Sequence, residues 1–131
     1  MATLPTAGPA DLAQLVEAWI LGHRPASSRR EREPYDWAAD RLDALASDRP
    51  GEALAVIWAI LERSDDERVL ANLAAGPLED LLVRHGPEVI VAVEARARVD
   101  ARARKLLGAV WRNAIAEAVW QRLRKLAGPS W

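Results

Sequence analysis

Apolar residues recur at helical spacing along almost the whole chain, and this periodicity limits the fold more than any other feature. Leu12, Leu15, Val16 and Trp19 fall on one face of a helix, and similar stripes follow to about residue 126. The best strand candidate is VIVAV, residues 89–93. It has no second strand to pair with, and an isolated strand is not stable. The pattern therefore predicts an all-α fold.

Glycine and proline divide these stripes into short lengths. In LAAGPLEDLLVRHGPEVI, residues 73–90, the Gly-Pro step occurs twice. Glycine commonly follows the end of a helix, and proline suits the first turn of the next. The steps at Gly76-Pro77 and Gly86-Pro87 therefore predict a helix end followed by a helix start. We expect seven or eight short helices in one domain over residues 1–131, with an exposed basic loop at 23–34.

A weak internal repeat links two stretches of the chain. Residues 60–76 align with 94–110 at an offset of 34, which pairs Asp66 with Asp100 and Arg68 with Arg102. In both stretches Asp is expected to cap a helix. This arrangement resembles the second helix of HEAT-type repeats, and it predicts stacked antiparallel helix pairs.

Two further segments carry a family resemblance. ANLAAGPLEDLLVRHGPE at 71–88 and LLGAVWRNA at 106–114, after a helix containing Ala18-Trp19, resemble the signature of uncharacterised bacterial all-helical domains. The signature centres on LAAGPLEDLL and GAVWRNA. The chain departs from it at residues 114–117, where a polar helix cap is expected. The resemblance implies a helical architecture and supplies no catalytic residues.

The sequence offers little support for catalysis. Glu79 and Asp80 are neighbours and would point about 100° apart on a helix, so they cannot face one bond together. We expect them to complement the dipole of a helix that starts at Pro77. His23 and His85 lack zinc-site spacing, and no nucleophile elbow or phosphate-binding loop is present. We predict no catalytic residue, no metal and no cofactor.

The chain has no cysteine, which fits a reducing compartment. No apolar run reaches the roughly 18 residues of a membrane span. The first residues, MATLPTAGPADLAQ, lack the basic and apolar regions of a secretory signal. We therefore expect a cytoplasmic protein without membrane contact. Five of the six tryptophans lie in helical stripes and are predicted core residues, whereas Trp131 is a loose or docking residue.

Opposite charges are segregated along the chain. Residues 36–80 carry eleven acidic and four basic groups, a net of −7, whereas residues 96–125 carry nine basic and two acidic groups, a net of +7. The two regions could pair with each other, or each could face a partner. An acidic face for a basic protein would use Asp36, Asp40, Asp43, Asp65, Asp66, Glu67, Glu79 and Asp80. Phosphate contact by a nucleic-acid binder would use Arg96, Arg98, Arg102, Arg104 and Lys105.

These features favour a non-enzymatic protein-interaction module of a bacterial cytosol, in its specific form an immunity- or antitoxin-like inhibitor of a basic protein. The first alternative is a nucleic-acid-associated protein that uses the Arg-rich C-terminal third, although a pI near 6 argues against it. The second alternative is an enzyme in which Glu79, Asp80 or His85 meets distant carboxylates in a pocket. The oligomeric state stays open.

Overall fold

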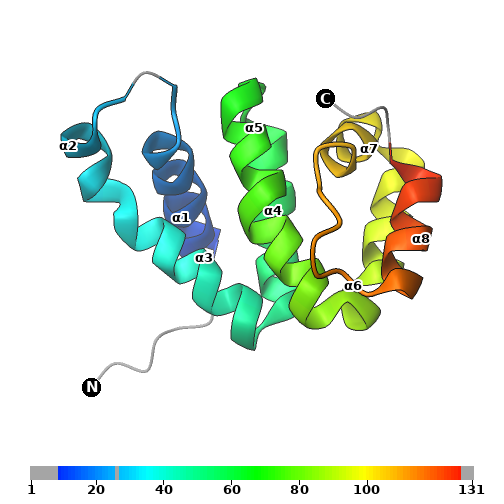
Figure 1. The fold of residues 1–131 in the computed structure, drawn as a ribbon. Helices are drawn as coiled ribbons and strands as arrows, with labels where there is room; N and C mark the ends of the chain where they lie inside the picture. The colour runs from blue at the N-terminus through cyan, green and yellow to red at the C-terminus, as the bar shows by residue number, and fades with distance from the viewer. Residues whose placement is uncertain (1–8, 26, 128–131) are drawn as a thin grey trace.

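The structure is a computed structural model that describes residues 9–25 and 27–127, with side chains from residue 11. In this part of the chain every regular element is helical and no strand occurs, which confirms the all-α prediction. Trp131 lies outside the described residues. The elements are α1 (Pro9–Gly22), α2 (Arg29–Arg32), η1 (Glu33–Tyr35), α3 (Asp36–Asp48), α4 (Pro50–Arg63), α5 (Glu67–Leu73), η2 (Ala74–Leu78), α6 (Glu79–Val99), α7 (Ala101–Leu107) and α8 (Glu117–Leu126) (Figure 1).

Several of these elements follow one another without a break. Helix α2, the 3₁₀ turn η1 and α3 form one run over 29–48, and α5, η2 and α6 form another over 67–99. The described residues therefore contain six continuous helical segments, and the expected seven or eight is wrong. Helix α1 packs on α3 and α4, α4 packs on α6, and α6 packs on α8. Helical segments that are close in the sequence are therefore mostly neighbours in space (Figure 1).

The Gly76-Pro77 step widens the helix and does not end it. Proline has no N–H to donate and its ring conflicts with the preceding turn. The chain accommodates Pro77 through the π-helical turn η2, where the N–H of Glu79 reaches the carbonyl of Ala74. The residues at both ends of this turn keep right-handed helical backbone. No helix begins at Pro77, so the predicted helix start is wrong; Glu79 and Asp80 lie in the first turn of α6, which continues directly from η2.

The Gly86-Pro87 step directly follows a kink that divides α6 into two helical stretches. The backbone of α6 leaves helical geometry at His85, with φ −134° and ψ 27°, and then resumes. A Cβ on Gly86 would lie 2.9 Å from Cγ2 of Val119. Among the described glycines none has a positive φ. Two helical stretches thus meet at His85, next to the predicted break at Gly86-Pro87, and Gly86 is also required for the close approach of α8.

The segment 23–34, predicted as an exposed basic loop, is exposed but partly helical. Ser28 opens α2 with a reciprocal capping box. The N–H of Glu31 donates to Oγ of Ser28 over 3.1 Å, and the N–H of Ser28 donates to Oε1 of Glu31 over 3.2 Å. Such a Ser-x-x-Glu pattern is a helix-start signal in the sequence. The loop prediction overlooked it, and Ala26 is not described.

Buried apolar side chains from α1 through α8 form one continuous core cluster. Trp19 is 1% exposed at its centre, and Trp58 and Trp120 are partly buried against it. Trp37 and Trp111 are 49% and 73% exposed, so their prediction as core residues is wrong. No helix within the described ranges combines the length and apolar character needed to cross a membrane.

The capping part of the repeat prediction is confirmed. Oδ1 of Asp66 accepts from the N–H groups of Arg68 at 2.9 Å and Val69 at 3.0 Å. Thirty-four residues later, Oδ1 of Asp100 accepts from the equivalent N–H groups at 2.9 and 3.3 Å. Each aspartate satisfies two amides that a helix start leaves without an internal partner. Asp66 and Asp100 therefore begin α5 and α7 in the same way.

Candidate functional site

The acidic and basic regions of the chain meet where the end of α4 and the start of α5 face α6 and α7. Nη2 of Arg102 lies 2.9 Å from Oδ1 of Asp65, and Nζ of Lys105 lies 3.7 Å from Oε1 of Glu67. Oppositely charged residues predicted to serve two different partners thus bind each other here. Because these pairs are exposed, each adds at most about 1 kcal/mol of stability.

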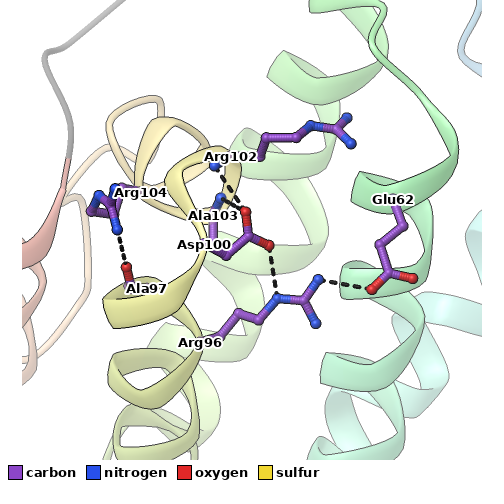
Figure 2. Close-up of polar contacts among 7 residues, drawn as sticks. All are labelled: Glu62, Arg96, Ala97, Asp100, Arg102, Ala103 and Arg104. Carbon is purple, nitrogen blue, oxygen red and sulfur yellow. Dashed lines mark hydrogen bonds and ion pairs between the residues drawn. The ribbon is translucent and has the colours of Figure 1, made fainter.

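Arg96 is the most engaged cation of this junction, and Figure 2 shows its guanidinium between two carboxylates. Its Nη2 donates to Oε1 of Glu62 over 2.8 Å, and its Nε donates to Oδ2 of Asp100 over 2.9 Å. The guanidinium carbon lies 5.3 Å from the centroid of the Trp58 ring, within cation–π range. The Glu62 hydrogen bond raises the pKa of Arg96. Burial raises the pKa of Asp100, but hydrogen bonds from Arg96, Ala103 and Arg102 outweigh it and hold that pKa below its usual value.

Two more arginines of this cluster bind backbone carbonyls. Arg102 donates to the carbonyl of Ser64 over 2.7 Å, and Arg104 donates to that of Ala97 over 2.6 Å (Figure 2 draws the second bond). Arg98 is exposed and forms no ion pair with the described carboxylates. Four of the five residues predicted to contact phosphate therefore have partners within the chain.

The eight predicted acidic residues separate into two groups. Asp65 and Glu67 are ion-paired, Asp66 caps α5, and Oε2 of Glu79 accepts from Nδ2 of Asn113 over 3.0 Å. The other four form no ion pair with any side chain that the structure describes. Three of them lie on α3 at helical spacing, so they share one face. We call this second group the acidic stripe: Asp36, Asp40, Asp43 and Asp80.

A cavity of about 370 Å³ opens beside the acidic stripe, and we call it the acidic cavity. Helix α1, helix α3, the π-helical turn η2 and the first turn of α6 surround it. π-helical turns are frequent at functional sites. The lining residues are Trp19, His23, Ala39, Asp43, Asn72, Ala75, Gly76, Pro77 and Asp80.

Two titratable groups of the acidic cavity are perturbed in opposite directions. Burial lowers the pKa of His23, although a hydrogen bond to the carbonyl of Trp19 opposes this effect. Burial also raises the pKa of Asp80. Arg84 opposes that shift, and the charges of Asp43 and Glu79 add to it. His23 is thus favoured in its neutral form and Asp80 in its protonated form, relative to the free side chains.

The ring of His23 has a defined orientation. It stacks on Trp19 with centroids 3.7 Å apart and an angle of 17° between the planes. Its Nδ1 lies 2.7 Å from the carbonyl oxygen of Trp19, and a carbonyl can only accept. Nδ1 therefore carries the proton, and Nε2 of the neutral ring is left as an acceptor. The four-residue spacing from Trp19 to His23 was a signal for this contact, because such residues are neighbours on a helix.

A second cavity, of about 600 Å³, lies between α5, α8 and the connection between α7 and α8. We call it the tryptophan cavity. Ala75 lines both cavities, so they are adjacent across the run of α5 and η2. No sequence pattern predicted this cavity. Its lining residues are Ala71, Ala75, Gly108, Ala109, Val110, Trp111, Arg112, Trp120 and Arg124.

The enzyme alternative required Glu79, Asp80 or His85 to meet distant carboxylates in a pocket. Asp80 does meet Asp43 in the acidic cavity. His85 lies elsewhere, between Oε1 of Glu88 at 3.0 Å and the carbonyl of Ser47 at 2.8 Å. Among the described residues, no three histidine or carboxylate side chains converge as a metal site would require.

Comparison with known proteins gives one family assignment. The model of a family of unknown function, DUF6869, matches residues 25–130, which is well over half of the chain and includes α3 through α8. No curated protein and no solved structure matches the chain. The expected membership of an uncharacterised family is confirmed: the chain belongs to DUF6869, a family of unknown function.

Proposed function

We propose that this protein is a non-enzymatic interaction module that binds a basic protein through the acidic stripe. The observation that carries the proposal is the contrast between the two acidic groups. Asp65 and Glu67 are neutralised within the chain, whereas the four carboxylates of the stripe have no ion pair to a described residue, and two of them, Asp43 and Asp80, line a cavity. Neighbouring like charges repel, and repulsion from Asp43 helps to raise the pKa of Asp80. A lysine or arginine of a partner would relieve this repulsion.

The finer form of the proposal is an immunity- or antitoxin-like inhibitor that covers a basic toxin. Its support is the acidic stripe and an analogy with small helical inhibitors. Complementary charge would speed the encounter and favour the right partner more than it would strengthen the final complex. The predicted binding face becomes smaller, because Asp65, Asp66, Glu67 and Glu79 have roles within the fold.

We also propose that the helices stack as in HEAT repeats and that this stacking forms the acidic binding face. The equivalent caps of Asp66 and Asp100 support it. So do two contacts between residues exactly one repeat offset apart, Glu62 with Arg96 and Glu79 with Asn113. In stacked repeats each unit contacts its neighbours, and the stack presents an extended surface for a macromolecule.

An acid–base enzyme is the second candidate. It is favoured by His23 and Asp80, whose pKa values move in opposite directions in one cavity. Such divergence is typical of general acid and base pairs. Hydrolysis of p-nitrophenyl acetate or p-nitrophenyl phosphate that is lost in both His23→Ala and Asp80→Asn would support this candidate. The nucleic-acid alternative has less support, because most of its arginines have partners in the chain.

The decisive experiment is capture of partners by the tagged protein from a lysate of its source cells, with nuclease added. We expect one stoichiometric basic protein, lost when Asp40 and Asp43 are both changed to lysine. The matched control is Asp65→Lys, which reverses the charge of an exposed residue predicted for the same acidic face. This variant should still capture the partner. Equal loss in both variants, or recovery of nucleic acid alone without nuclease, would refute the proposal.

A further inference from the structure

We infer that the tryptophan cavity binds an apolar segment of the partner protein that carries a carboxylate, adjacent to the acidic stripe. This inference rests on the proposed function, because it takes the occupant to be a protein. It adds a second contact surface with the opposite charge requirement.

Trp111 is presented in a fixed position. It is 73% exposed, yet the chain around it is held at several points. Asn113 has the left-handed φ of 37° that asparagine tolerates, and its side chain donates to Glu79 of α6. Arg112 pairs with Glu117 of α8, and the N–H of Ile115 donates to the carbonyl of Arg112 over 2.8 Å. A partner would gain the area of this indole without the entropic cost of ordering the loop.

The walls of the cavity suit an apolar side chain. Ala71, Ala75, Gly108 and Ala109 are small, so a partner can approach the backbone closely. The rings of Trp111 and Trp120 supply large apolar surfaces at the sides. Tryptophan in a formed cavity is the residue type most often responsible for the affinity of protein interfaces. The volume of about 600 Å³ is in the range of a ligand-binding site.

The charge of the lining defines the chemistry of the occupant. Arg112 and Arg124 are the ionic residues among the described residues that line the cavity, and none of these lining residues is a carboxylate. The guanidinium of Arg124 lies 5.7 Å from the centroid of Trp120, and it forms no ion pair with the described carboxylates. Arg112 already pairs with Glu117, so a carboxylate on the occupant would complement Arg124.

A protein segment fits this cavity better than a single nucleic-acid strand. Strand binding needs a continuous basic track along the phosphates beside the aromatic rings. Arg96, Arg102 and Arg104 would have to supply that track, but their guanidinium groups bind Glu62, Asp65 and backbone carbonyls. The guanidinium of Arg124 and the apolar walls match one carboxylate next to an apolar side chain.

The shared wall at Ala75 sets the arrangement of the partner. A segment that crosses α5 and η2 would place an apolar, acidic part over the tryptophan cavity and a basic part over the acidic cavity. We therefore expect the bound segment to have carboxylates and basic groups at opposite ends.

The test is a selection of 16-residue random peptides displayed against the immobilised protein, followed by affinity measurement with fluorescein-labelled peptides. We expect enriched peptides to combine a large apolar residue with nearby Asp or Glu. Their Kd should rise at least tenfold in Trp111→Ala and several-fold in Arg124→Gln. Trp37→Ala is the matched control, because it removes another exposed tryptophan far along the chain, and its Kd should not change.

Three results would overturn the inference: no enriched peptide, peptides without acidic residues, or peptides insensitive to Trp111→Ala. Tighter binding of the oligonucleotide dT20 than of any peptide, lost in Trp111→Ala, would assign the cavity to nucleic acid. The Asp40/Asp43 lysine variant separates this inference from the proposed function. If peptides bind at Trp111 but the lysine variant still captures the partner, only the acidic-stripe proposal is contradicted. If the lysine variant loses the partner but no peptide binds at Trp111, only the inference is contradicted.

Discussion

Arg96 and Glu62, 34 residues apart in the chain, join α6 to α4 through a hydrogen bond of 2.8 Å. The same guanidinium binds Asp100 and lies over Trp58, so one side chain links three parts of the fold. We expect Arg96→Gln to lower the free energy of unfolding by about 1 kcal/mol, because it removes two charged contacts and a cation–π contact. Urea unfolding measures this change. Arg98→Gln, on the same helix, should have almost no effect, and equal losses would contradict the prediction.

Removing the two equivalent aspartate caps should have unequal effects. Asp66→Ala removes the cap of α5 and should cost about 1 kcal/mol of stability. Asp100→Ala removes the cap of α7 together with the Arg96 contact, so its cost should be larger. The folded pKa of Asp100 is lowered. Its contribution is therefore present above the unfolded value of about 3.9 and is lost as the pH falls through the folded pKa. Thermal unfolding measures the difference in Tm between wild type and Asp100→Ala, and this difference should be smaller at pH 2.5 than at pH 7.

Gly86→Ala should destabilise the fold although it improves helix propensity. The new Cβ would lie 2.9 Å from Val119 and force α6 and α8 apart, at a cost of about 1–3 kcal/mol. The propensity gain of up to about 1 kcal/mol offsets only part of that cost. Gly51→Ala is the control, because nothing lies within 4 Å of its Cβ, and it should be neutral or stabilising. A stabilised Gly86→Ala protein would show that α8 can move away freely.

His85 should make stability depend on pH near neutrality. Hydrogen bonds to Glu88 and to the carbonyl of Ser47 raise its pKa above the unfolded value of about 6.5. A raised folded pKa contributes stability that is complete below the unfolded pKa and is lost as the pH rises through the folded one. The free energy of unfolding of wild type should therefore exceed that of His85→Gln by more at pH 5.5 than at pH 9. Chemical denaturation at the two pH values gives the comparison, and NMR titration of the ring checks the pKa directly.

Asp80→Asn should increase stability at neutral pH. The pKa of Asp80 is raised mainly by burial, so the folded state disfavours its charge. Stability is then highest below the unfolded pKa and falls as the pH rises through the folded pKa. Asparagine removes this loss, with a gain at pH 7 of less than about 1 kcal/mol that should vanish near pH 3. No gain at pH 7 would mean that the carboxylate is well solvated, and it would remove one support for the proposed site.

Local signals in the sequence predicted much of the fold. Helical periodicity identified the all-α class, and the Asp-x-Arg pattern located the caps at Asp66 and Asp100. The Gly76-Pro77 step differs from the predicted helix end, because the surrounding helix widens to tolerate proline, whereas the Gly86-Pro87 step coincides with a kink. The turn η2 packs on α4, and α6 packs on α8 beside the kink at His85. Such tertiary constraints are not visible in a window of ten residues.

The candidate site was less predictable than the fold. Charge segregation indicated that acidic and basic regions matter, but pairing within the chain depends on which helices meet. Asp65 and Asp43 look alike in sequence, yet one pairs with Arg102 and the other lines a cavity. Trp111 resembled a core residue because it follows the stripe of α7, whereas the helix ends at Leu107 and the chain then turns outward.

Ala75 has a consequence for genetics. It is exposed and lines both cavities, so its side chain can be enlarged without disturbing the buried core. An arginine at this position would obstruct the two surfaces at once while the folded protein accumulates normally. One codon change would thus give an allele that separates loss of recognition from loss of the protein.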